Sequence, residues 1–203
     1  MNVDKGPFRL ALTAMVVVAL SCGVVPASAQ PSPREATPFR NEWVVMSGVG
    51  SSVGDGERAG REQAFSSIEW GHLVSGEHGP GILRGRLEMA IEITPVFRAF
   101  QSHRAEGAGF LPLMFRWNLR EHSRIHPFLE VAGGVVATNR DMPEGTTRFN
   151  FSSHAGAGTR VRVAEQWGVV VGYRFQHLSN GSTAPRNPGI NSNVGYLGLV
   201  YRR

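Results

Sequence analysis

The strongest constraint on the fold is an alternation of apolar and polar side chains that recurs from Asn41 to the end of the chain. The clearest segment runs from Arg84 to Phe100. Its two rows are Leu87, Met89, Ile91, Ile93 and Phe97, against Arg86, Glu88, Ala90, Glu92 and Thr94. Successive side chains of a β-strand point to opposite faces, so this pattern predicts a strand with one apolar and one polar face.

Eight segments of the chain show this strand character, with Gly-, Pro- or charge-rich turns between them. They cover residues 41–53, 63–74, 84–100, 111–120, 129–136, 148–157, 169–180 and 193–201. In the fourth segment, the apolar row is Leu111, Leu113, Phe115, Trp117 and Leu119. Pro95 lies inside the third segment and predicts a bulge or a strand end there, because proline cannot donate to a ladder.

Charged side chains fall in the middle of the polar rows. They are Glu88, Glu92 and Glu130 together with Arg86, Arg116 and Arg174. Buried without partners, such charges would cost several kcal/mol each, so they need each other or water. The lumen of a membrane barrel supplies both. A soluble β-sandwich with a solvated outer face would produce the same alternation, so the pattern alone leaves two architectures open.

The N-terminus favours the membrane architecture. Lys5 and Arg9 precede an apolar run over residues 10–25, and Ala27-Ser28-Ala29 forms a small-x-small cleavage pattern, which is typical of a secretory signal peptide. A lipoprotein signal ending at Cys22 is the alternative. Exported strands of nine or more residues in an even number are typical of outer-membrane barrels, although the chain ends Tyr201-Arg202-Arg203 rather than on an aromatic residue.

We therefore expect an all-β chain with a cleaved signal peptide over 1–29, an irregular lead-in over 30–40 and an eight-stranded antiparallel transmembrane β-barrel over 41–203. A barrel of this size is filled by side chains, so a general pore is not expected. The formal net charge of +5 fits anionic lipid phosphates at a bacterial surface better than nucleic acid. The sequence indicates no metal or organic cofactor, and a homodimer is compatible with it.

The seventh segment places His177 and Ser179 on its apolar row, after Val171, Tyr173 and Phe175. In a barrel this row faces lipid. Residues i and i+2 lie about 7 Å apart at Cα, so the imidazole can reach and activate the hydroxyl. The plainer interpretation is a polar pair at the membrane interface where the strand ends. Tyr173 and Phe175 would give an acyl chain an apolar track.

The stretch His177-Leu-Ser179-Asn180, followed by Asn187-Pro-Gly-Ile-Asn191, resembles the lipid A 3-O-deacylase family, the PagL-type acyloxyacyl hydrolases. The resemblance implies an outer-membrane serine esterase that removes a 3-hydroxyacyl chain from the 3-position of lipid A in lipopolysaccharide. It further implies Ser179 as the nucleophile, His177 as its base, and Asn180 and Asn187 as oxyanion donors. Arg186, in the same loop, could hold a headgroup phosphate or be a solvated cation.

One position departs from the family pattern: Asn191 stands where the family has a glutamate. An asparagine oxygen can accept the ring N–H and fix the tautomer, but it brings no charge to the imidazolium. Asp141 or Glu144 from another loop could supply a carboxylate. Two alternatives follow, a phospholipase that uses the same residues and a catalytically silent structural or binding barrel.

Overall fold

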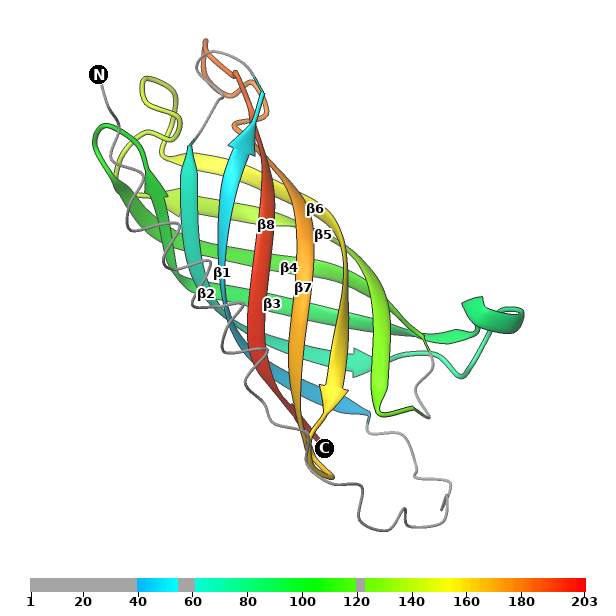
Figure 1. The fold of residues 1–203 in the computed structure, drawn as a ribbon. Coiled ribbons are helices and arrows are strands. Elements are labelled where there is room, and N and C mark those ends of the chain that lie inside the picture. Colours follow the sequence, from blue (N-terminus) through cyan, green and yellow to red (C-terminus); the bar gives the residue numbers. More distant parts are fainter. Residues whose placement is uncertain (1–39, 55–60, 120–122) are drawn as a thin grey trace. The chain divides into compact units, whose positions relative to one another are not determined.

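The structure is a computed structural model that describes residues 40–54, 61–119 and 123–203. The expected signal peptide, and the lead-in up to residue 39, lie outside the described residues. Eight strands make up nearly all of the rest (Figure 1): β1 Asn41–Val53, β2 Glu62–Leu73, β3 Gly85–Phe100, β4 Ala105–Leu119, β5 Ile125–Thr138, β6 Phe149–Arg162, β7 Trp167–Ser179 and β8 Ile190–Arg202. One 3₁₀ turn, η2, spans Gly81–Leu83. In the described ranges, no helix combines the length and apolarity needed to cross a membrane.

The eight strands close into a barrel in which every neighbouring pair is antiparallel. Each strand pairs with the next along the chain, and β1 pairs with both β2 and β8, from Glu42 opposite Arg202 to Val53 opposite Asn191. The expected eight-stranded antiparallel barrel is thereby confirmed. Closure leaves no unpaired edge, which is the condition for a sheet to cross a bilayer.

The barrel wall is apolar outside and charged inside, the reverse of a soluble protein. Val45 is 59% exposed and Leu113 is 57% exposed, whereas the side chain of Arg116 is only 2% exposed. An apolar outer band with a polar interior is the arrangement that hydrocarbon requires. The soluble sandwich does not fit this surface.

Ion pairs fill the lumen, as the mid-strand charges predicted. Arg116 donates to Glu69 at 2.6 Å, to Glu88 at 2.9 Å and to Glu130 at 2.8 Å. Arg174 donates to Glu92 and again to Glu130, both at 2.8 Å. Each buried charge therefore has an opposite partner, which offsets its desolvation cost.

Two residues face the opposite side of the wall from the one expected. Phe97 and Leu111 were both placed on the lipid-facing row, but they are buried inside the barrel. The pairing of β3 with β4 shifts between Thr94 and Phe97, and again opposite Leu111. A bulge adds a residue to one strand and so reverses the alternation beyond it. The bulge expected at Pro95 is present, whereas the two side-chain placements were wrong.

The two ends of the barrel differ in their side chains and connections. One end carries the first residue of β1, the last of β8 and the outward-facing Trp43, which lies opposite Trp70 and Tyr201. Trp167 packs on Tyr201 with 5.0 Å between ring centroids, so aromatic residues line this end on the neighbouring strands β7, β8, β1 and β2, as they do at membrane interfaces. The other end carries the connections 101–104, 139–148 and 180–189, and β7 ends there at Ser179.

Candidate active site

The outward row of β7 carries the residues that the sequence singled out. Tyr173, Phe175 and His177 are exposed on the outer wall, Ser179 is half-buried on the same row, and Arg174 between them points into the lumen. The structure thus places the histidine and the serine on the lipid-facing side, next to the loop-bearing end of the barrel. This placement agrees with the face that the period-two pattern predicted.

Asn191 lies beside His177 because β8 begins earlier than expected. The sequence predicted a strand from Asn193, but β8 begins at Ile190, and Asn191 is the direct cross-strand partner of His177. The ring Nδ1–H of His177 donates to Asn191 Oδ1 at 2.7 Å. An amide oxygen only accepts, so this bond holds the proton on Nδ1 and leaves Nε2 with a free lone pair.

Gly189 is the last residue of the 180–189 connection, and it lies close to the edge of the His177 imidazole. Its φ is +64°, a conformation that side-chain-bearing residues rarely adopt. A Cβ at this position would lie 3.1 Å from His177 Cε1 and 3.9 Å from Nε2. The histidine therefore has a hydrogen bond on Nδ1 and Gly189 beside its Cε1 edge.

Asn180 organises the turn that follows the serine. It is buried, its Nδ2 donates to the Arg186 carbonyl at 2.8 Å, and its Oδ1 accepts the Ser182 backbone N–H at 2.9 Å. Asn187 accepts the Asn180 backbone N–H at 3.2 Å, and its own Nδ2 lies at 3.5 Å from the Ser182 hydroxyl. Both asparagines expected near an oxyanion thus lie in this turn. Each Nδ2 group has two hydrogens, and these contacts use only one of them.

The side chains expected to contact substrate occupy two different places. The Tyr173 hydroxyl donates to Asn193 Oδ1 at 2.6 Å, and Phe175 lies opposite Ala155 on β6 and opposite Asn193 on β8. Both rings remain on the outer wall beside His177. Arg186 lies in the 180–189 connection, where its Nη1 is 3.1 Å from the position of a Cβ on Gly145, so it belongs to the junction of two loops.

The two loop carboxylates considered as substitutes for the missing acid make contacts elsewhere. Glu144 accepts the His103 backbone N–H at 2.7 Å, and this hydrogen bond holds the pKa of Glu144 below its usual value. Asp141 lies 3.9 Å from the Arg148 guanidinium. The partner that the structure gives to the His177 ring is Asn191.

Two neighbours of the site were not anticipated from the sequence. Ser153 on β6 is the other cross-strand partner of His177, and it is exposed on the same outer face. Phe151 lies opposite Ser179, and its ring would be 2.9 Å from a Cβ on Gly181. They are identified only by the register between β6 and β7. The pattern of one strand segment does not show how that strand pairs with its neighbour.

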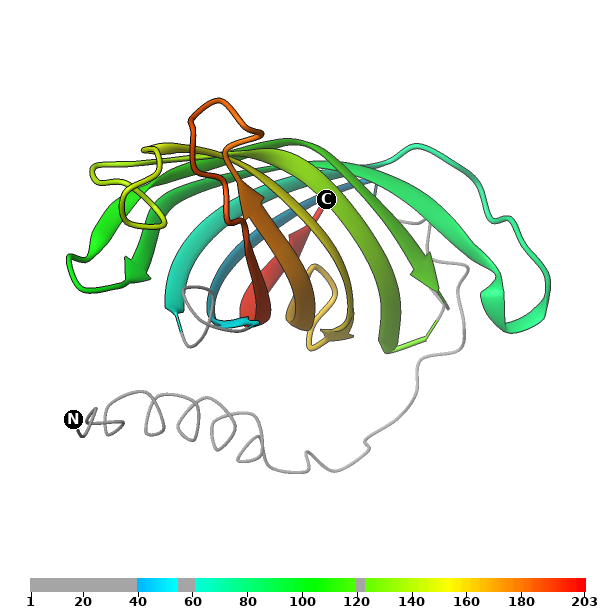
Figure 2. The ribbon, with the colours of Figure 1, turned by 90° about the horizontal axis from the view of Figure 1, so that it is seen from above.

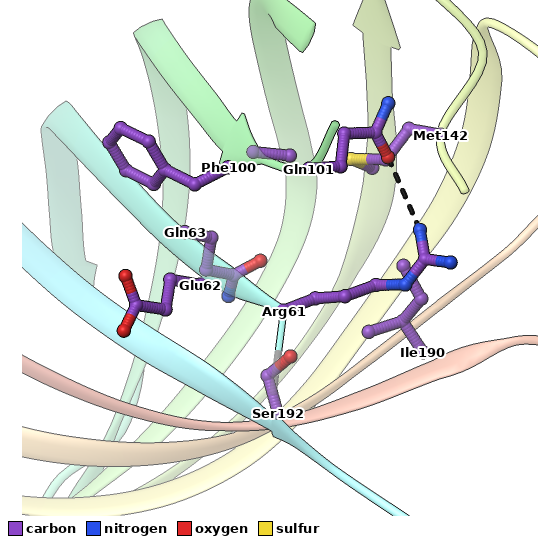
Figure 3. Close-up of a pocket in the computed structure, with 9 residues that line it drawn as sticks. Arg61, Glu62, Gln63, Phe100, Gln101, Met142, Ile190 and Ser192 are labelled. Atoms are coloured by element: carbon purple, nitrogen blue, oxygen red, sulfur yellow. Dashed lines mark hydrogen bonds between the residues drawn. The ribbon is translucent and has the colours of Figure 1, made fainter. Parts of the chain in front are cut away.

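A hollow on the inner side of the wall is lined by sequence neighbours of Asn191, but it faces away from the site. It is a small hollow, open to solvent, with Ile190 and Ser192 of β8 in its lining (Figure 3). Arg61 crosses it and donates to Gln101 Oε1 at 3.3 Å. Asn191, between Ile190 and Ser192, points outward, so the strand wall separates this hollow from His177.

One group of carboxylates in the described ranges has the spacing of metal ligands. Oxygens of Glu42, Glu69 and Glu88 lie within 4.8 Å of one another inside the lumen. Arg116 contacts Glu69 and Glu88, and Arg160 contacts Glu42 and Glu88, so guanidinium groups supply the positive charge there.

Comparison with known proteins connects this chain to a family. The family model described as lipid A 3-O-deacylase (PagL) matches residues 61–200. A crystal structure of the outer membrane enzyme PagL superposes with a TM-score of 0.59 at 20% identity, covering 76% of this chain and 97% of that one. Neisserial surface protein A (NspA) superposes with a TM-score of 0.54 at 10% identity, covering 80% and 97%. A search of curated proteins found no significant match.

Proposed function

This chain belongs to the lipid A 3-O-deacylase (PagL) family of outer-membrane β-barrels, and we propose that it hydrolyses the ester at the 3-position of lipid A with Ser179, His177 and Asn191. The observation that carries the proposal is the 2.7 Å hydrogen bond from His177 Nδ1 to Asn191 Oδ1, on the same outward row as Ser179. That bond prepares Nε2 as a base on the side of the wall where a lipid substrate diffuses.

The first half of the reaction transfers the acyl chain to the enzyme. Ser179 Oγ attacks the ester carbonyl while His177 Nε2 takes the hydroxyl proton, and the carbonyl oxygen becomes an oxyanion. The remaining amide hydrogens of Asn180 and Asn187 would stabilise this oxyanion. The intermediate then expels the sugar 3-oxygen, which takes the proton from His177 and leaves as a free hydroxyl.

The second half releases the 3-hydroxy fatty acid. His177 Nε2 removes a proton from a water molecule, which attacks the acyl-enzyme carbonyl. Collapse of the second intermediate returns the proton to Ser179 Oγ and frees the acid. Asn191 keeps the imidazole in the required tautomer through both halves, without the charge that a glutamate would bring to the imidazolium.

The surroundings of the site suit an amphiphilic substrate. Tyr173 and Phe175 extend the outer wall below His177 with apolar surface for the acyl chain. Arg186, at the junction of the 139–148 and 180–189 connections, could pair with a headgroup phosphate at the membrane surface. For the N-terminus we keep the proposal of a signal peptide over residues 1–29, which a mature chain that starts at Gln30 would support.

The substrate can be tested with purified barrel in mixed micelles. We expect release of 3-hydroxy fatty acid from lipid A by the native protein and none by Ser179→Ala. Release of fatty acid from phosphatidylethanolamine with lipid A left intact would show a phospholipase instead, since that variant reaction uses the same residues.

The uncharged Asn191 also supports a second candidate, a catalytically silent barrel with a binding or structural role. A serine-directed phosphonate probe separates the two candidates. Labelling of the native protein, with no labelling of Ser179→Ala, is expected for an esterase. Equal absence of labelling in both folded proteins would favour the silent barrel.

A further inference from the structure

The connection between β2 and β3 exposes the most accessible large apolar side chain of the described barrel. Ile82 is 75% exposed and its neighbour Leu83 is 58% exposed, both on η2. Figures 1 and 2 show this connection reaching outward past the ends of the neighbouring strands. It lies at the end where β1 begins and β8 ends, because the Leu73 backbone N–H, where the connection starts, donates to the Arg40 carbonyl at 2.9 Å.

Hydrogen bonds hold this connection in a defined shape. His78 and Gly85 exchange two backbone hydrogen bonds at 2.9 Å, which extend the β2–β3 hairpin beyond the wall. Glu77 pairs with Arg84 at 2.9 Å, and the Arg84 backbone N–H donates to the Gly81 carbonyl at 3.2 Å. The turn therefore presents Ile82 and Leu83 from a fixed base.

A tryptophan of the lipid-facing wall binds the turn directly. Trp117 belongs to the outward row of β4, and its Nε1–H donates to the Leu83 carbonyl at 3.0 Å. Gly85 permits this contact, because a Cβ there would lie 2.8 Å from Trp117 Nε1. Tryptophan with an apolar ring and a polar edge marks the bilayer interface, so Leu83 is continuous with the lipid-covered belt.

We propose that Ile82 and Leu83 insert into the phospholipid leaflet at the end of the barrel where β1 begins and β8 ends, and anchor this side of the wall. The β6–β7 connection at the same end spans only residues 163–166, whereas the β2–β3 connection spans residues 74–84 and exposes two apolar side chains at its tip, which burial in lipid would stabilise. A phospholipid monolayer fits, since it is the medium that already covers Trp117. The anchor is independent of the chemistry proposed for Ser179.

The test uses the full-length chain with Cys22→Ser, so that one introduced cysteine carries a fluorescent label. Ile82→Cys is compared with Glu165→Cys, an exposed position in another turn at the same end of the barrel. Both are labelled with a nitrobenzoxadiazole dye and reconstituted into phosphatidylcholine–phosphatidylglycerol vesicles, with folding checked by heat-modifiable gel mobility. A quencher attached high on the lipid acyl chain should reduce the Ile82 signal about twofold and leave the Glu165 signal unchanged, as for interfacial anchors.

Equal responses at the two positions would overturn the anchor. A shielded Ile82 dye that the lipid quencher does not reach, with shielding that grows with protein concentration, would also overturn it. That outcome would mean that a second copy of the chain covers the turn. Because neither substitution touches Ser179, His177 or Asn191, the result does not depend on the proposed esterase.

Discussion

Asn191 is the residue on which the proposed chemistry depends most. Its oxygen accepts from His177 Nδ1 at 2.7 Å, which fixes the tautomer, but it leaves the imidazolium without a countercharge. Hydrogen bonds to charged groups contribute about 1 kcal/mol more than neutral ones, so the isosteric Asn191→Asp should raise turnover about fivefold. Asn191→Glu tests the family's own residue at the same position.

The measurement is kcat for fatty-acid release from lipid A, with Asn193→Asp as the matched control one outward position further along β8. The control should not raise turnover, because Asn193 binds the Tyr173 hydroxyl rather than the imidazole. Lower or unchanged turnover in folded Asn191→Asp would remove this residue from the third position of the triad.

Gly189 sets the position of the imidazole from the other side. Gly189→Ala would place a methyl group 3.1 Å from His177 Cε1 on a backbone with φ of +64°. Small displacements of a catalytic base are costly, so we expect turnover to fall about tenfold or more while the barrel stays folded. Gly76→Ala is the control, because a Cβ there meets nothing within 4 Å. Equal turnover in the two variants would contradict the close fit around His177.

The residues of the site show what a single sequence can and cannot predict. His177 and Ser179 were found because a period of two identifies which residues share a face within one strand. The contact of His177 with Asn191, and the presence of Ser153 and Phe151, depend on pairing between strands. Nothing in the local sequence encodes that register.

Element boundaries were predictable where the two faces differ in polarity. β1 has the predicted bounds, Asn41–Val53, but β8 begins three residues before the predicted Asn193. From Asn191 to Asn193 the side chains on both faces are polar, so no alternation marks the strand. The proposed site lies at this start of β8. Because the polar residues gave no alternation, the sequence did not predict that Asn191 belongs to the strand.

The bulges between β3 and β4 yield a prediction about stability. Phe97 packs inside the barrel with Ala99 and Val136, whereas Phe100 on the same strand faces outward. Phe97→Ala should lower the free energy of unfolding by about 3–5 kcal/mol through the cavity it leaves, and Phe100→Ala by clearly less. Urea unfolding of the barrel in micelles measures both. A larger loss at Phe100 would mean that the alternation continues unbroken past Pro95.

At the scale of the whole molecule, the lumen network holds the wall together. Arg116 joins Glu69, Glu88 and Glu130, which come from three different strands. Arg116→Met would leave these buried carboxylates without their shared partner, and we expect a loss of about 3–5 kcal/mol in the free energy of unfolding. Arg98→Met breaks the exposed pair with Glu106 and should cost at most about 1 kcal/mol. Similar unfolding midpoints for both variants would show that the lumen charges are solvated.

The charged lumen and the apolar wall together explain why the chemistry is proposed outside the barrel. Ion pairs occupy the interior, so the route left for an amphiphile is lateral diffusion along the outer face of β7. From the sequence, the mid-strand charges such as Glu88 and Arg116 required a lumen or water, and the export signal with an even number of long strands favoured the lumen.

The most direct test of the account is mass spectrometry of lipid A from cells that carry this protein in the outer membrane, beside cells that carry Ser179→Ala. The account predicts the loss of one 3-hydroxyacyl mass with the native protein and intact lipid A with the variant. Identical spectra from the two strains, with both barrels folded in the outer membrane, would contradict the proposed deacylase.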